Sequence, residues 1–183
     1  SKPIVSQGNC SSSYAITPVS VINDRWCKLN PAEHPVLSPQ GPLLAIKLLI
    51  KDANKILSRT LDYAKIYGLV NNLVIHTVLL QIHPNNAKKP QKIVKNSKFP
   101  IIVSLNNNKI LNNKLLTMSV IAVIPVYRDF LIYKTGVYQV YPGNQKFSSG
   151  HAIKVIGWDV RDGKNCWLVE NSWGEDWGQN GVG

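Results

Sequence analysis

Residues 166–174 read CWLVENSWG, and residues 149–152 upstream of them read SGHA. His151 directly precedes the mostly apolar stretch 152–158, and Asn171 directly follows the stretch 166–170, which is apolar except for Glu170. Runs of β-branched and aromatic residues bounded by Gly, Asn and Asp are typical of strands. We therefore expect a β-rich region in which a histidine and an asparagine, 20 residues apart (171 − 151), each stand at the end of a strand.

The predicted strands all lie from residue 120 onward, at 120–126, 152–158 and 166–170. The first part shows helical spacing instead, and helices followed by strands are typical of an α+β fold rather than an alternating α/β sheet. A chain of 183 residues can form a sizeable core. We expect one domain over residues 1–183, with a helical lobe at about 1–100 and a β-rich lobe at about 101–183.

The first predicted helix covers residues 13–28, with Ser11 or Ser12 as its N-cap. Pro18 would remove one backbone hydrogen bond inside this helix, at a typical cost of about 3 kcal/mol. The helix is therefore either kinked at Pro18 or irregular in its first turn. Its apolar residues recur at helical spacing at Ile16, Val19, Ile22 and Trp26.

A second helix is expected at 43–50, with a cap in the stretch 37–40 before it, and a third at 57–67, closed by Gly68. The apolar run 73–82 fits a strand or a helix. Residues 83–100 are polar, rich in lysine and interrupted by prolines, which predicts a surface loop.

Two residues near the N-terminus complete a pattern with His151 and Asn171. Gln7 precedes Ser13 by six residues (13 − 7), and His151 follows Ser13 by 138 (151 − 13). This spacing resembles the papain-like cysteine peptidases, in which the histidine and asparagine follow the nucleophile by about 130–150 residues. Residues 126–138, VYRDFLIYKTGVY, are similar to the cathepsin B-like members of that family in particular.

The resemblance implies a papain-like fold of two lobes, with the nucleophile helix in the helical lobe and the histidine and asparagine in a β-barrel-like lobe. It implies that residue 13 holds the nucleophile, that His151 is the general acid and base, and that Asn171 orients it. Gln7 would bind the oxyanion and Trp173 would cover the His–Asn contact. It also implies further segments before Gln7 and after residue 181, so we expect a domain shortened at both ends.

Ser13 departs from the family, which has cysteine at this position. A cysteine pKa of about 8.5 can fall to about 3–4 beside a histidine, whereas a serine hydroxyl stays protonated. Serine hydrolases add a carboxylate behind the histidine, and the matching residue here is the neutral Asn171. We expect an inactive cathepsin B-like protein. The alternatives are a weak serine-nucleophile peptidase, or a non-catalytic binding or decoy protein that uses the cleft or a basic loop face.

Three cysteines leave at least one without a partner inside the chain. The resemblance implies a family partner for Cys10 in a Cys-Asn-Gly-Gly motif, but the matching stretch 51–56 has no cysteine. A glycine pair that binds substrate in the family is likewise replaced at Lys55 and Ile56. Cys166, which precedes Trp167 and Leu168, is expected to be a buried hydrophobic residue.

The charge pattern and the composition argue against a nucleic-acid site, a membrane span and a metal site. The net charge is +11, and residues 63–128 contain nine lysines and arginines but no Asp or Glu. Few aromatic residues are interleaved with these lysines, whereas a nucleic-acid site requires them for stacking, so we interpret the lysines as a solvated surface. No apolar run reaches the 18 or so residues of a membrane span, and we expect no signal peptide within the given sequence. His76 and His83 have no flanking cysteines, and we expect no metal and no cofactor.

The partners and compartment that we expect follow from the resemblance. A peptide or protein substrate or inhibitor would bind in the cleft of a monomer, and the protein would be lysosomal, endosomal or extracellular.

Overall fold

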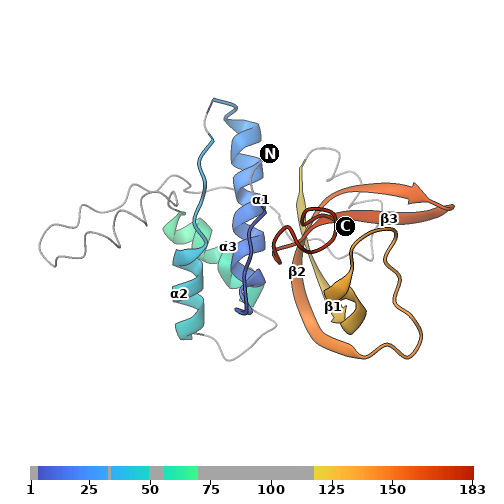
Figure 1. The fold of residues 1–183 in the computed structure, drawn as a ribbon. Helices are drawn as coiled ribbons and strands as arrows, with labels where there is room; N and C mark the ends of the chain where they lie inside the picture. Colours follow the sequence, from blue (N-terminus) through green and yellow to red (C-terminus); the bar gives the residue numbers. More distant parts are fainter. Residues whose placement is uncertain (1–3, 33, 50–55, 70–117) are drawn as a thin grey trace, which may run out of the picture. The chain divides into compact units, whose positions relative to one another are not determined.

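The computed structural model describes residues 4–32, 34–49, 56–69 and 118–183. The predicted run at 73–82, the loop at 83–100, and the positions Lys55, His76 and His83 lie outside these ranges. The helices are α1 (Ser13–Leu29), α2 (Gln40–Leu49) and α3 (Ile56–Tyr67), and the strands are β1 (Val120–Tyr127), β2 (Lys146–Arg161) and β3 (Lys164–Glu170) (Figure 1). A short 3-10 helix, η2, covers Arg128–Ile132. The expected α+β class is confirmed.

The chain divides into two compact units, one formed by residues 1–17 with 101–183 and the other by residues 18–100. Helix α1 starts in the first unit and continues through Pro18 into the second, so the proline does not end the helix. The lobe limits near residue 100 remain a prediction. None of the helices in the described ranges is long and apolar enough to cross a membrane.

The helix ends follow local hydrogen bonding. Helix α2 begins at Gln40, three residues before the predicted start, because the Ser38 hydroxyl accepts a hydrogen bond from the Gln40 N–H at 3.2 Å. Helix α3 ends as predicted at Gly68, whose φ of +74° is a conformation that glycine adopts without strain.

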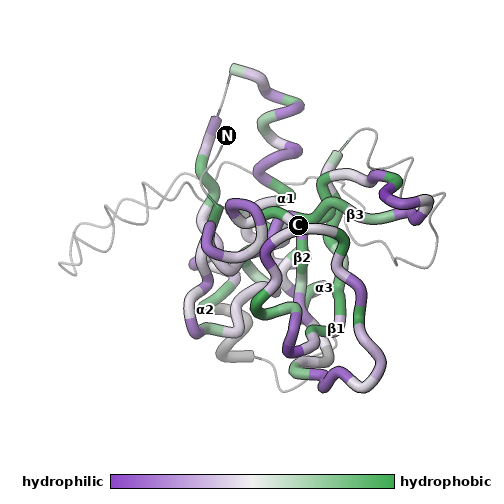
Figure 2. The backbone as a smooth tube through the Cα atoms, turned by 45° about the vertical axis from the view of Figure 1, so that its right-hand side comes forward, coloured by the Kyte–Doolittle hydropathy of each residue, from purple (hydrophilic) through white to green (hydrophobic). Residues whose placement is uncertain are grey.

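The sheet of the first unit is antiparallel and has the order β1-β2-β3. β2 is the central strand and starts at Lys146 instead of residue 152, because Ser148 and Lys146 also pair with β1. Beyond Gly157 the β2–β3 hairpin leaves the core and becomes exposed, with a hydrophilic tip at 161–164 (Figure 2). Cys166 lies in this hairpin and is only half-buried, so its expected burial was wrong.

One face of the sheet packs against a group of aromatic side chains. Phe130 is the centre of this group, with ring centroids 5.0 Å from Trp177 and 5.7 Å from Trp173. The indole N–H of Trp177 donates a hydrogen bond of 2.8 Å to the backbone oxygen of Phe130. Buried sheet residues complete this core, namely Val120, Ala122, Val126, Ile153 and Val155. The aromatic group therefore holds the segment after β3 against the sheet.

Candidate functional site

His151 lies in the middle of β2, opposite Ile124 of β1, and only 5% of its surface is exposed. Asn171 is the first residue after β3 and is 3% exposed. Since β3 pairs with β2, its end brings Asn171 to His151, and the His151 Nε2 and Asn171 Oδ1 atoms are 2.8 Å apart. The two residues identified in the sequence thus form one buried hydrogen bond.

The hydrogen bonds of Asn171 define the proton position on His151. Asn171 Oδ1 also accepts the Ser172 backbone N–H at 2.8 Å, so this atom is the amide oxygen and can only accept. His151 therefore donates through Nε2–H, and the neutral ring has its lone pair on Nδ1. Burial lowers the pKa of His151, and the bond to Asn171 only partly opposes this effect.

Trp173 packs against the His151 ring. Its ring centroid is 4.6 Å from that of His151, at an interplanar angle of 32°. Trp173 also makes edge-to-face contacts with Phe130 and Trp177, which are 69° and 88° from parallel. The aromatic core therefore fixes the indole over the imidazole and limits the access of water to it.

Gln7 is held by the residue that follows Asn171. The Gln7 backbone N–H donates to the Ser172 carbonyl oxygen at 2.8 Å, and its side-chain oxygen accepts the Ser172 hydroxyl at 2.6 Å. Its amide nitrogen donates to the Cys10 carbonyl oxygen at 2.8 Å. Fixing Gln7 Oε1 in this way fixes the amide plane, and it leaves the second N–H of the amide for another acceptor.

Ser13 is the first residue of α1, and its hydroxyl oxygen accepts the backbone N–H of Ala152 at 3.3 Å. Ala152 directly follows His151, so Ser13 contacts the backbone beside the histidine. Among the described interactions of Ser13 there is no hydrogen bond to the His151 ring. Residue 13 also lies at the N-terminal end of α1, where the helix dipole favours a negative charge.

All five residues predicted from the sequence lie in the first unit: Gln7, Ser13, His151, Asn171 and Trp173. Their contacts connect them, with Ser172 and Ala152 as intermediaries. Sequence reasoning missed Ser172 and Thr17, whose hydroxyls bind Gln7 and the Ala152 carbonyl. Only their positions in the sequence could have indicated these two residues. Ser172 directly follows Asn171, and Thr17 stands one helical turn after Ser13.

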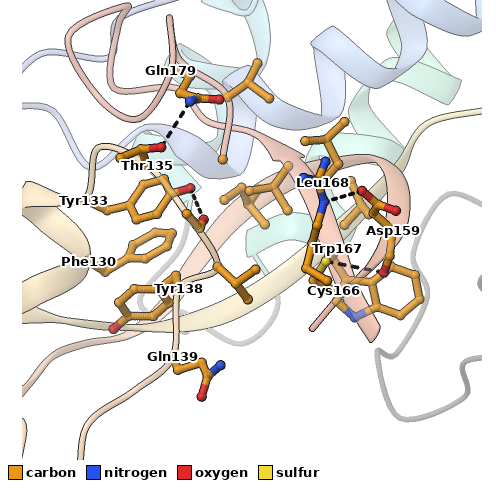
Figure 3. A pocket seen from close by; sticks show the side chains of 18 of the residues that line it. Phe130, Tyr133, Thr135, Tyr138, Gln139, Asp159, Cys166, Trp167, Leu168 and Gln179 are labelled. Carbon is orange, nitrogen blue, oxygen red and sulfur yellow. Dashed lines mark hydrogen bonds and ion pairs between the residues drawn. The ribbon is translucent and has the colours of Figure 1, made fainter. Parts of the chain in front are cut away.

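A separate pocket of about 710 Å³ lies in the same unit (Figure 3). Phe130, Tyr133 and Trp177 contribute to its lining, as does the Arg161–Asp159 ion pair. Neither Ser13 nor His151 lines it. We therefore interpret this pocket as an open side of the aromatic core, distinct from the site around Ser13 and His151.

The described ranges contain no group of three or more His, Cys, Asp or Glu residues that could hold a metal ion. No disulfide connects Cys10, Cys27 and Cys166.

The burial of His151 predicts a pH-dependent stability. Because its folded pKa lies below the ordinary value of 6.5, the unfolded chain takes up this proton first as the pH falls. The stability present above pH 6.5 should therefore decrease below it, down to the folded pKa. Urea midpoints measured between about pH 7.5 and 5 will show this decrease in the wild type. The His151→Gln variant should lose part of this decrease. A pH profile that is unchanged in this variant would contradict the assignment of the decrease to His151.

Replacement of Gly174 should also lower the stability of the fold. Its φ is +84°, and an added Cβ would lie 3.4 Å from the Ser6 Cβ. We expect Gly174→Ala to lower the free energy of unfolding by about 1–2 kcal/mol, because left-handed backbone is strained for other residues. Gly136→Ala is the matched control for the contact with Ser6, because Gly136 has a similar φ of +86° but open space around it. Chemical denaturation of both variants measures the two costs, and a Gly174→Ala protein as stable as the wild type would refute the prediction.

Comparison with known proteins places these residues in context. Residues 1–182 match the family model described as papain family cysteine protease. Among curated proteins, the chain is 41% identical to a cathepsin B-like cysteine proteinase of Schistosoma japonicum over 78 residues, which are 42% of this chain and 22% of that protein. It is 52% identical to a gut-specific cysteine proteinase of Caenorhabditis elegans over 60 residues, which are 33% of this chain and 18% of that protein. The chain thus matches less than a quarter of the length of either relative.

Among solved structures, procathepsin B S9 of Trypanosoma congolense superposes with a TM-score of 0.71 at 23% identity. The match covers 99% of this chain and 65% of that one. This likeness shows the papain-like fold that the motifs implied.

Proposed function

The chain belongs to the papain family of cysteine proteases, and on this premise we propose that it is a cathepsin B-like member whose catalytic frame persists without peptidase activity. In this proposal Ser13 stands at the nucleophile position, His151 at the acid–base position, and Asn171 at the position that orients the histidine. Gln7 contributes to the oxyanion site and Trp173 shields the His–Asn contact. The family reaction is hydrolysis of a peptide bond.

The observation that carries the proposal is the environment of the Ser13 hydroxyl. The Ala152 N–H and the first turn of α1 both point partial positive charge at residue 13, and both would stabilise a thiolate. The same groups cannot ionise a hydroxyl near neutral pH, since its pKa is far higher than that of a thiol. Accepting the Ala152 N–H also occupies a lone pair of the hydroxyl oxygen, which weakens it as a nucleophile. Ser13 therefore stands at the nucleophile position, but its hydroxyl is not activated for attack.

Gln7 supports the same frame. An oxyanion site needs donors that are already fixed before the reaction. Ser172 fixes the Gln7 amide from the segment that also carries Asn171, so the oxyanion donor and the histidine partner are held together. This arrangement supports the proposal that the oxyanion-binding geometry at Gln7 persists although the thiol at residue 13 is lost.

A second candidate is a weak serine-nucleophile peptidase. The neutral tautomer of His151 favours this candidate. Its neutral ring donates through Nε2 and has a free lone pair on Nδ1, the form that a general base needs. Asn171 contributes no negative charge to stabilise the imidazolium that would form, so we expect at most a slow reaction.

The remaining assignments are also proposals. The protein would bind a peptide or a protease inhibitor as a monomer, in a lysosomal, endosomal or extracellular compartment. The helical and β-rich lobes at about 1–100 and 101–183 would form one domain.

Turnover of fluorogenic peptides separates the two candidates. We expect wild-type protein and Ser13→Ala to release fluorophore at the same background rate over about pH 4–8. Turnover by the wild type that Ser13→Ala abolishes would overturn the inactive assignment and support the serine peptidase. His151→Ala is a second control, because turnover that depends on Ser13 through a general base must also depend on His151.

A further inference from the structure

Two hydrogen bonds connect helix α1 to β2, and both involve the backbone of Ala152. The Ala152 N–H donates to the Ser13 hydroxyl oxygen at 3.3 Å. The Ala152 carbonyl oxygen accepts the Thr17 hydroxyl at 2.9 Å. Ala152 and Thr17 are 5% and 4% exposed, so neither peptide group of Ala152 has ready access to water. Two side chains of one helix thus satisfy both backbone groups of the residue that follows His151.

The sheet register explains why these groups need partners from a helix. β3 pairs with β2 as far as Lys154 opposite Glu170, and the chain then turns away through Asn171. In an antiparallel sheet, residues two apart direct their N–H and C=O groups to the same neighbour. Ala152 is two residues from Lys154, so its groups point past the end of β3. Buried peptide groups without partners are costly, and Ser13 and Thr17 take the place of the missing strand.

The helical spacing makes this replacement possible. Residues four apart on a helix lie on one face, one turn from each other. A hydroxyl can both donate and accept. Ser13 therefore supplies the acceptor for the N–H group of Ala152, and Thr17 supplies the donor for its C=O group. The pair fixes the N-terminal turn of α1 to the backbone beside the His151 ring.

We propose that Thr17 is a positioning residue of the site, which sets the separation between the side chain of residue 13 and His151 by anchoring the Ala152 carbonyl. This inference rests on the proposed function, in which residue 13 and His151 form a catalytic pair. Thr17 touches no reacting atom in this role. Its contact does not depend on the side chain at residue 13, so it persists when Ser13 is replaced.

Hydrogen exchange of single amides tests the anchor without any need for activity. In Thr17→Val, which keeps the shape of the side chain and removes its hydroxyl, the Ala152 amide should exchange roughly tenfold faster than in the wild type. The amides of Ile153 and Val155 should change much less. Thr17→Ser keeps the hydroxyl and should restore slow exchange at Ala152. If Thr17→Val does not fold, Thr17→Ala serves for the same comparison.

Two outcomes of this experiment would overturn the proposal. One is an Ala152 amide that exchanges in Thr17→Val as slowly as in the wild type. The other is an equal acceleration along all of β2, because that would make Thr17 a residue of general stability rather than an anchor at Ala152.

The functional consequence is measured on a thiol at residue 13. Iodoacetamide labelling of Ser13→Cys against pH, with peptide mapping to separate residue 13 from Cys10, Cys27 and Cys166, gives the apparent pKa of the new thiol. Adding Thr17→Val should move this pKa up toward that of an ordinary thiol, and adding Thr17→Ser should not. An unmoved pKa in the Thr17→Val protein would overturn the positioning role. If Ser13→Cys alone titrates as an ordinary thiol, the proposed catalytic pair fails, while amide exchange still decides whether Thr17 anchors Ala152.

Discussion

Ser13→Cys is expected to produce a reactive thiol at a position where the wild type has none. The Ala152 N–H, the first turn of α1 and the nearby His151 all stabilise a negative charge on the side chain of residue 13. Alkylation of the introduced thiol should therefore remain fast well below about pH 8.5, the ordinary thiol pKa. Hydrolysis of a fluorogenic peptide should rise by at least about 10³-fold over the wild type, since the loss of a nucleophile costs more than that in comparable enzymes.

The control for Ser13→Cys is the same substitution with His151→Ala. Without the imidazole, the thiol should titrate closer to its ordinary pKa and turnover should return to background. Fast alkylation without turnover would mean that the frame of Gln7, His151 and Asn171 is intact and that substrate binding is lost elsewhere. Slow alkylation with an ordinary pKa would contradict the proposal that Ser13 occupies an otherwise functional nucleophile position.

The site residues could be predicted from the sequence because their order and spacing are fixed by the fold. His151 and Asn171 each stand beside an apolar run, and pairing of β2 with β3 brings these runs together. The start of β2 could not be predicted in this way. Apart from Phe147, residues 146–151 are polar or small, and they become a strand only because β1 supplies a partner. Tertiary pairing here overrides local propensity.

The supporting contacts were harder to predict than the site itself. A hydroxyl in a helix usually points to solvent or to its own backbone, so Thr17 gave no signal of a bond to a residue 135 positions away. The half-buried position of Cys166 was missed for a related reason. An apolar run predicts a strand but not how far the hairpin projects from the core, and Trp158 and Val160 in the same hairpin are 39% and 58% exposed. Sequence periodicity reports the type of element, whereas burial depends on what packs against it.

Asn171→Asp is expected to change His151 more than any other single substitution near the ring. A carboxylate at this position would face the Nε2–H at 2.8 Å and would also accept the Ser172 N–H. An adjacent negative charge favours the imidazolium, so the pKa of His151 should rise above its wild-type value. The substitution also removes the Asn171 Nδ2 group, which is buried and has no hydrogen-bond partner among the described residues. NMR titration of the His151 ring measures the pKa change.

The same substitution tests whether Ser13 can act as a nucleophile at all. In serine proteases the change from aspartate to asparagine behind the histidine lowers kcat by about 10⁴. The reverse change should recover only a small part of this factor, on the order of tenfold, because the Ser13 hydroxyl is bonded to Ala152 rather than to His151. Asn171→Asp with Ser13→Ala is the matched control, since any gain that runs through Ser13 must disappear in it. Asn171→Leu removes the hydrogen bond without adding charge and should lower the pKa of His151. A pKa that rises in Asn171→Asp without any gain in turnover would place the defect at Ser13 itself, whereas an unchanged pKa would contradict the His–Asn geometry from which both proposals proceed.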